Sequence, residues 1–395
     1  MKSISAKHAP QISPCSPIRV RQTMQTGGGS KSASEPSIVA IRPGGFGASI
    51  VLARTAVGAL VSLIAMRAMI ARKPILTKDV AEWVMSEDAQ IFDRRLLRAR
   101  RARFAEGFAE HEFLIAHVAT ELAERIGAVL REFPLGLDLG AHHGLVGCRV
   151  AALPNVGAMV YADSTFELAA RCPRPSLVCD EDLLPFREPS FNLIVSGLAL
   201  HRVNDIPGAL IQIRRCLVPD GLFMAATLGA RSLLELRTAL LEAETEMQGG
   251  ASPHIAPFAD VREYGALLQR AGFALPVTDS EIVTVTYATL IDLMRELRAM
   301  GGGNVLQSRR KTPLARGTIE RAEQIYRTRH SVQGGKIGAS FEIVYLCGWA
   351  PDASQQKPLS PGSAKTRLAD ALGTTEQSAG DKTPFRRRRR ETGAS

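Results

Sequence analysis

The sequence predicts a doubly wound α/β domain built on a mostly parallel sheet of seven strands. Five short apolar runs lie at 135–140, 159–163, 176–180, 191–200 and 221–229, and helical segments separate most of them. Two later runs, at 281–287 and 340–350, are rich in β-branched and aromatic residues. Short apolar runs that alternate with helices are typical of parallel strands buried on both faces.

The elements follow in a regular order. Residues 113–133 carry apolar side chains at helical spacing and precede the first strand, and IPGALIQIRRCL is one of the helices between later strands. Two helical stretches, 289–303 and 312–330, separate the last two strands. We expect one of these late strands to run antiparallel to its neighbour, so that five parallel strands are followed by a final hairpin.

The two ends of the chain differ from the middle in composition. Residues 1–45 are rich in Ser, Pro and Gly, which predicts disorder. Residues 46–71 are more apolar, but Arg54 and Arg67 leave an uninterrupted stretch far short of the ~20 residues of a spanning helix, so we expect no integral membrane span.

These ends set the expected domain boundaries. We interpret 1–84 as a disordered extension or as an upstream region that is not translated, with initiation at Met85 favoured over a targeting presequence. The folded domain is expected at 85–350. The tail 351–395, which ends in FRRRRRETGAS, is predicted to be disordered and basic.

The charge of the chain lies mainly in its ends. The net charge is +10, yet residues 85–350 hold 29 Lys/Arg against 31 Asp/Glu. An enzyme that acts on nucleic acid is expected to carry its basic charge on the folded body, so this distribution argues against such a substrate. The exception is 91–103, whose six arginines we interpret as a solvated face or a docking surface.

The cysteines indicate no structural metal site. The six cysteines form no CxxC pair and no Cys/His spacing typical of zinc, which favours reduced thiols in a cytosol-like compartment.

Acidic and glycine residues at the strand ends predict a nucleoside site. Asp138 ends the first strand, with Gly140 and Gly144 in the turn that follows, and Asp163 and Asp180 end the next two strands. Ligands of such sheets bind beyond the carboxyl ends of the strands. We expect Asp163 to accept hydrogen bonds from ribose hydroxyls and Asp180 to accept one from an adenine amino group, beside an apolar wall formed by LPF. A pyrophosphate site is less favoured, because neither GxGxxG nor GxxxxGK[ST] occurs.

Several motifs carry a resemblance to a known family. DLGAHHG, YADS, CDEDLLPF, FNLIVSGLALHRVND and LVPDGLF, in this order, resemble the class I S-adenosylmethionine-dependent methyltransferases, in particular the group with the malonyl-carrier-protein methyltransferase of biotin synthesis. IFDRRLLRARRAR, ELRTALLEAETEMQGGASPHIAPF and LLQRAGF are similar to the mitochondrial complex I assembly factor 5 family and its bacterial relatives. The resemblance covers residues 91–350, and SPHIAPF is its most specific part.

The resemblance implies a cofactor, a partner and a location. It implies S-adenosyl-L-methionine as cofactor and a protein substrate, namely a respiratory-complex subunit. The location would be the cytoplasm of a bacterial-type cell, at the periphery of the inner membrane, or the mitochondrial matrix if the chain is eukaryotic.

The resemblance also implies which residues bind the cofactor. Eight positions match the family's binding residues: Asp138, Gly140, Ala141 and Gly144 in the loop, Asp163 at the ribose, Asp180 and Glu181 at the adenine, and Leu198 in the stretch to His201 that walls the methionine end. The loop departs from the family's usual DLGCGxG, because His142 and His143 stand where the backbone normally approaches the methionine moiety.

Few catalytic residues are expected. Methyl transfer needs chiefly in-line positioning, with a base only where the acceptor loses a proton. The candidate polar groups are His201 and His254, together with Glu244 or Glu246.

Three alternatives to protein methylation stay open. The complex I branch of the resemblance is linked to arginine hydroxylation, but no HxD or HxE triplet supports an iron site, and His142 and His143 are adjacent on a turn and are expected to point apart. A non-catalytic assembly chaperone is the second alternative. Methylation of a malonyl carrier protein is the third.

Overall fold

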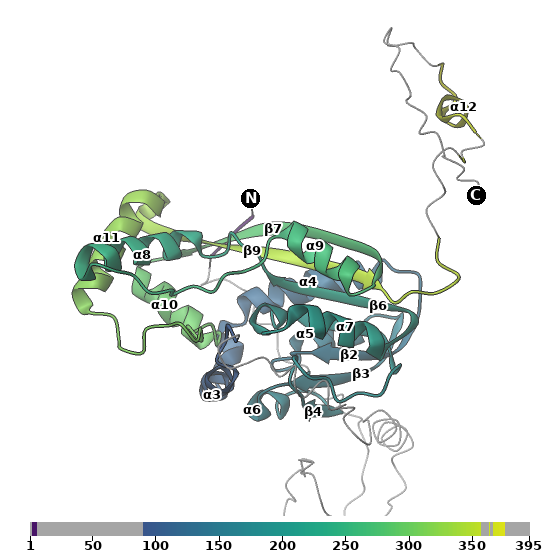
Figure 1. Ribbon diagram of the computed structural model, residues 1–395, viewed down its shortest axis with the longest axis horizontal. Coiled ribbons are helices and arrows are strands. Elements are labelled where there is room, and N and C mark those ends of the chain that lie inside the picture. Colours follow the sequence, from purple (N-terminus) through teal and green to yellow (C-terminus); the bar gives the residue numbers. More distant parts are fainter. Residues whose placement is uncertain (1, 6–89, 357–362, 364–365, 376–395) are drawn as a thin grey trace, which may run out of the picture. The chain divides into compact units, whose positions relative to one another are not determined.

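The computed structural model describes residues 2–5, 90–356, 363 and 366–375 of the chain (Figure 1). The chain forms two compact units, one ending at Asp352 and the other beginning at Ala353. The apolar stretch 46–71 and the boundary expected at residue 85 lie outside the described residues. No helix in the described part of the chain has the length and apolar character needed to cross a bilayer.

Nine strands among the described residues form a single sheet in the order β1-β7-β9-β6-β5-β2-β3-β4, with β8 paired to β9. They span Lys2–Ser5 (β1), Phe133–Leu139 (β2), Val156–Asp163 (β3), Ser176–Val178 (β4), Phe191–Gly197 (β5), Leu217–Leu228 (β6), Ala274–Tyr287 (β7), Ser331–Val332 (β8) and Lys336–Trp349 (β9). The five strands from β2 to β6 pair in parallel, which confirms the predicted parallel run.

The last two long strands pair with each other, as the predicted hairpin requires. β9 runs antiparallel to both β6 and β7 and lies between them, so one late strand is antiparallel as predicted. The connection between β7 and β9 contains two helices, Leu290–Ala299 and Arg316–His330, which confirms the two predicted helical stretches. Inserting β9 between β6 and β7 gives it a full set of backbone partners on both sides, which suits its continuous apolar sequence.

Helices cover both faces of the sheet, as the doubly wound prediction requires. They span Arg94–Phe104 (α3), Phe113–Gly127 (α4), Leu145–Ala151 (α5), Phe166–Ala169 (α6), Ile206–Cys216 (α7), Leu234–Gln248 (α8), Val261–Arg270 (α9), Leu290–Ala299 (α10), Arg316–His330 (α11) and Leu368–Leu372 (α12), with 3-10 turns at Phe108–His111 (η2), Leu200–Arg202 (η3) and Gln333–Gly335 (η4). On β5, Leu193 packs into the core under α4 and α5, while Ile194 packs into the core under α7 and α9. Figure 1 shows α8, α10 and α11 together at one end of the sheet.

Two short elements lie in segments that the sequence predicts to be disordered. β1 pairs its backbone in parallel with β7, which supplies an open strand edge. In the second unit, α12 ends at Gly373, whose left-handed conformation (φ 60°) suits a helix C-cap.

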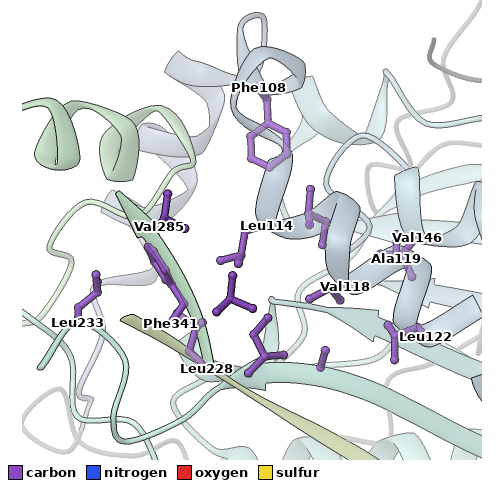
Figure 2. Packing of buried hydrophobic residues seen from close by; sticks show 14 of the residues in the cluster. Phe108, Leu114, Val118, Ala119, Leu122, Val146, Leu228, Leu233, Val285 and Phe341 are labelled. Atoms are coloured by element: carbon purple, nitrogen blue, oxygen red, sulfur yellow. The ribbon is translucent and has the colours of Figure 1, made fainter. Parts of the chain in front are cut away.

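Helix α4 shows why the core forms on this side. Its apolar residues recur at helical spacing, and Leu114, Val118 and Leu122 are almost fully buried. Figure 2 shows these side chains directed from α4 toward the strands. Burial of each such side chain stabilises the fold by about 1.5–3 kcal/mol.

Candidate functional site

The turn between β2 and α5 is built on three glycines and one buried acid. Asp138 is fully buried, and one of its carboxylate oxygens accepts a hydrogen bond from Gly147 N at 2.8 Å. A Cβ on Gly147 would lie 2.8 Å from that oxygen. Gly140 (φ +70°) and Gly144 (φ +91°) both take left-handed conformations that favour glycine. Asp138 therefore lies behind the loop and holds the first turn of α5.

The opposite carboxylate oxygen of Asp138, Oδ1, has no hydrogen-bond partner among the described residues. Burial raises the pKa of Asp138 to about 7, although the hydrogen bond from Gly147 opposes this rise. A buried carboxyl with one unpaired oxygen is more stable when that oxygen carries a proton.

His142 takes a left-handed conformation (φ 55°) although it has a side chain. Its ring stacks on Phe108 with centroids 5.2 Å apart, and Nε2 lies 3.0 Å from the carbonyl oxygen of Gly197. Nδ1 lies 2.9 Å from the Arg101 guanidinium, which can only donate, so Nε2 carries the proton. Burial lowers the pKa of His142 well below its usual range, and the charge of Arg101 adds to this effect, so the ring is neutral.

His143 points away from His142, as expected for adjacent residues of a turn. Its Nε2 lies 2.6 Å from Glu112, in the segment before α4. The two rings therefore have different partners. The described residues hold one group with metal-ligand spacing, His117, Glu121 and Glu281, and neither histidine of the loop belongs to it.

Asp163, the acid that ends β3, is fully buried and hydrogen-bonded on both oxygens. One oxygen accepts from the backbone N–H of Thr165 at 2.8 Å, and the other accepts from His142 N at 2.9 Å and from Arg101 at 2.7 Å. Arg101 is itself only 6% exposed. The Asp163 and Arg101 side chains thus form a buried ion pair at the strand ends.

Asp180 and Glu181, after β4, are also paired with arginines of α3. Arg94 bonds both carboxylates and lies 3.2 Å from Asp182, and Arg98 donates to Asp180 at 2.6 Å. Burial alone would lower the pKa of Arg94, but Glu181 and Asp180 outweigh it and raise that pKa. We call the four carboxylates of Asp163, Asp180, Glu181 and Asp182 the acid cluster.

This role of α3 was not predicted from the sequence. Arg94, Arg98 and Arg101 recur at i, i+4 and i+7, which places them on one helix face. That spacing was the available signal. The interpretation of this stretch as a solvated face or docking surface is wrong for these three residues, because their guanidinium groups pair with the acid cluster.

A cavity of about 100 Å³ lies next to the loop. Its apolar wall includes Phe108, Leu114, Leu228, Leu233 and Phe341, and Figure 2 shows these five side chains gathered from different elements. The polar groups that line it include His142, His201, Arg202 and His254. We call it the inner cavity.

His201 is a polar group on the wall of the inner cavity that is buried without a hydrogen-bond partner among the described residues. It is 5% exposed, and neither ring nitrogen has a hydrogen-bond partner among the described residues. Burial lowers the pKa of His201 well below its usual range, and the charge of Arg202 adds to this effect. A neutral, unpaired imidazole on a cavity wall is able to hydrogen-bond a ligand. Leu198, predicted at the methionine end, lines the same cavity with φ 51°.

His254 and Glu244 form a connected pair at the cavity's edge. Glu244 Oε2 lies 2.9 Å from His254 Nε2 and accepts from Ser252 N at 2.7 Å, so it fixes the SPHIAPF segment on α8. Glu246 is elsewhere, on the surface, where it pairs with Arg321 at 2.6 Å. Of the two glutamates considered, Glu244 is the one that reaches a cavity residue.

Phe186, one of the three residues of the predicted apolar wall beside Asp180, does not face an open site. Phe186 is buried in the core and packs edge-to-face on Phe191, with ring centroids 5.1 Å apart. Its side chain fills the space between the sheet and α7, so it does not border an open site.

Comparison with known proteins connects this geometry to a family. Residues 108–276 match the family described as "Methyltransferase domain". The chain is 36% identical over 290 residues to the "Arginine-hydroxylase NDUFAF5, mitochondrial" of Danio rerio, which covers 71% of this chain and 89% of that protein. It is 39% identical to the human protein of that name, over 71% of this chain and 83% of that protein. It is also 34% identical to the malonyl-[acyl-carrier protein] O-methyltransferase of Halorhodospira halophila, over 70% of this chain and 95% of that protein.

The chain belongs to the class I S-adenosylmethionine-dependent methyltransferases. Its cofactor is S-adenosylmethionine.

The loop and strand-end residues of this chain are of the types that such a cofactor needs. Gly140 brings the loop so close to the end of β5 that a Cβ would meet Ala199 Cβ at 2.2 Å, and Asp163, Asp180 and Glu181 follow the next two strands. In the structure Arg101 and His142 N share one carboxylate oxygen of Asp163, and Thr165 N donates to the other. A ribose hydroxyl that binds the oxygen of Asp163 contacted by Arg101 would compete with the guanidinium group.

Proposed function

We propose that this protein is an S-adenosylmethionine-dependent methyltransferase that acts on a protein acceptor, a subunit of respiratory complex I, and contributes to assembly of that complex. The observation that carries the proposal is the inner cavity, where the unpaired imidazole of His201 lies beside the cofactor loop. The likeness to relatives named for arginine chemistry favours a protein side chain as acceptor. We place the reaction in a bacterial-type cytoplasm, or in the mitochondrial matrix if the chain is eukaryotic.

In this proposal the strand ends hold the cofactor. The backbone at Gly140, Ala141 and Gly144 approaches it, Asp163 accepts the ribose hydroxyls, and Asp180 and Glu181 lie on the adenine side. The bound cofactor supplies an activated methyl group. Asp138 acts indirectly, because its hydrogen bond to Gly147 N keeps the loop and α5 in place.

The inner cavity receives the acceptor. Its apolar wall excludes water from the acceptor side chain, and His201 accepts a hydrogen bond from it. Because the ring of His201 is neutral, it accepts a hydrogen bond without prior loss of a proton. His254, held by Glu244, is the second candidate catalytic group, at the edge of the same cavity.

Hydroxylation of an arginine side chain is the second candidate function. The observation that favours it is the name of the relatives with 36% and 39% identity. The same cavity would hold the arginine. Methylation transfers the methyl group of S-adenosylmethionine and releases S-adenosylhomocysteine, whereas hydroxylation inserts one oxygen atom of O2 and requires a two-electron reductant that reduces the other oxygen atom to water.

Intact-mass spectrometry separates these functions. The purified chain and S-adenosylmethionine are incubated with purified complex I subunits in one reaction and with a malonyl carrier protein in a parallel reaction. Gain of a methyl group by a complex I subunit supports the proposal, gain of an oxygen atom favours hydroxylation, and methylation of the carrier protein alone favours that substrate. If no acceptor changes although the cofactor binds, the chain is a non-catalytic scaffold.

A variant assigns the reaction to the cavity. His201→Ala should lose most methyl transfer while still binding S-adenosylmethionine. His330→Ala, at the end of α11 and outside the inner cavity, is the matched control. Equal activity of both variants would contradict the role of His201.

A further inference from the structure

A second, wider groove adjoins the inner cavity and is lined by cations. It has a volume of about 570 Å³, within the roughly 300–1,000 Å³ range of small-molecule sites. Segments 254–255 and 302–304 and Leu297 line both spaces, so the groove and the inner cavity share a wall. We call this groove the basic groove, after the five cationic side chains that line it: Arg100, Arg298, Arg309, Arg310 and Lys311.

The fold collects these cations from separate parts of the sequence. Arg100 comes from α3, Arg298 from α10, and the other three from the segment that precedes α11. The near-neutral charge of residues 85–350 hides this concentration, so sequence composition gave no sign of it.

Only two of the five cations are balanced by a carboxylate within the described part of the chain. Arg309 lies 3.2 Å from Asp93, and Arg310 lies 2.7 Å from Glu244. Arg100 donates to the carbonyl oxygen of Asn304 at 2.5 Å, and no ion pair is found for Arg100, Arg298 or Lys311 among the described residues. Three cations of the groove thus have no carboxylate at ion-pair distance among the described residues.

The position of Arg100 in the groove is electrostatically unfavourable. Burial lowers the pKa of Arg100, and repulsion from Arg309 and Arg298 adds to this effect. A Cβ on Gly303 would lie 2.9 Å from the Arg100 guanidinium, so the glycine allows this close approach. An anion in the groove would relieve the repulsion among these guanidinium groups.

We propose that the basic groove binds a ligand with a phosphate monoester or diphosphate group. Guanidinium groups match phosphate oxygens in pairs, and these three cations suit a group with two or more negative charges better than a single carboxylate. Because the groove and the inner cavity share a wall, an apolar part of the ligand attached to the phosphate group can extend toward the inner cavity and His201. The phosphate site is independent of the proposed function, and only the placement of the apolar part rests on it.

Titration calorimetry of the full chain with inorganic pyrophosphate, and separately with inorganic phosphate, tests the proposal. Pyrophosphate should bind at low salt, more tightly than phosphate, and the affinity should fall as sodium chloride is raised. Arg298→Ala should weaken pyrophosphate binding at least about tenfold, as expected for loss of a charge-assisted contact. Lys311→Ala should weaken it less, because an exposed lysine acts as a point charge.

Matched controls keep the outcome specific. Arg295→Ala removes a cation one turn away on α10, where Arg295 is 72% exposed and lies 3.5 Å from Asp292, and it should leave the affinity unchanged. Equal losses in Arg295→Ala and Arg298→Ala would overturn the proposal, since they would indicate a nonspecific charge effect. So would binding of a glutamate-rich peptide in place of pyrophosphate.

Binding of S-adenosylmethionine, measured on the same variants, separates this proposal from the proposed function. Arg298→Ala should bind the cofactor as the wild type does. Loss of pyrophosphate binding with retained cofactor binding supports the groove, whereas a wild type that binds the cofactor but not pyrophosphate overturns the groove and leaves the methyltransferase proposal intact.

Discussion

Two sides of helix α3 meet opposite electrostatic surroundings. Arg94 and Arg101 face the acid cluster, where each buried guanidinium has carboxylate partners, whereas Arg100 faces the basic groove and other cations. Arginines of a single helix thus have two different roles. Paired charges fix α3 on the strand ends, and unpaired charges remain available to a ligand.

We expect the largest loss of stability when Arg101 is removed. Arg101→Ala leaves Asp163 buried without its cation, which should lower the free energy of unfolding by about 3–5 kcal/mol. Arg100→Ala, one residue away, should change it by less than about 1 kcal/mol, because no carboxylate loses a partner. Urea denaturation of both variants measures the contrast. Similar losses for both would show that the two sides of α3 do not differ as described.

The pH dependence of stability tests an acid that has no arginine. The folded pKa of Asp138 is raised from 3.8 to about 7, so between these values the folded state binds more protons than the unfolded state. Stability should therefore fall as pH rises through this window. Between pH 5 and pH 8 the wild type should lose roughly 2.5–3 kcal/mol relative to Asp138→Asn, at about 1.4 kcal/mol per pH unit below the folded pKa.

Urea titrations of wild type and Asp138→Asn at both pH values measure this loss. Asp292→Asn, an acid 42% exposed on α10, is the control and should follow the wild type. A constant difference between wild type and Asp138→Asn across the range would mean that Asp138 stays ionised in the folded protein.

The affinity for S-adenosylmethionine tests whether Asp163 binds the cofactor. If the ribose hydroxyls take the place of Arg101, Asp163→Asn should weaken S-adenosylmethionine binding at least about tenfold, or about 1.4 kcal/mol. Asp182→Asn perturbs the same acid cluster through Arg94 and should have a smaller effect. Calorimetric titration, at a temperature where circular dichroism shows both variants folded, gives the two affinities. Unchanged affinity in Asp163→Asn would remove this residue from the cofactor site.

The sequence predicted the fold better than the site, for a physical reason. Strand periodicity and strand-end acids are local patterns, so β2 to β6 and the positions of Asp138, Asp163 and Asp180 follow from residues close in sequence. The arginine partners of Asp163 and Asp180 come from α3, more than 60 residues earlier in the chain, and Phe108 reaches His142 from η2. Such pairings depend on how helices dock, which no local pattern determines.

The candidate site also depends on packing that no local sequence pattern determines. His201 and His254 were recognisable as polar groups in apolar surroundings, and the fold brings both to the inner cavity. Glu244 and Glu246 are not distinguished by their positions in the sequence. Only the packing of the SPHIAPF segment against α8 directs Glu244 to His254 and leaves Glu246 on the surface.

His142 is the loop residue whose side chain contacts Arg101. We therefore expect His142→Gly to lower the free energy of unfolding by less than Arg101→Ala does. Glycine relieves about 1 kcal/mol of left-handed backbone strain but removes two side-chain hydrogen bonds of about 0.5–1.5 kcal/mol each and the stack on Phe108. We expect a net loss of roughly 1 kcal/mol in unfolding free energy, together with tighter S-adenosylmethionine binding, because Arg101 is released more easily from Asp163. His143→Ala changes the same turn without touching Arg101 and should leave cofactor affinity unchanged. Tighter binding in both variants would mean that loop flexibility, and not the hold on Arg101, limits access to the acid cluster.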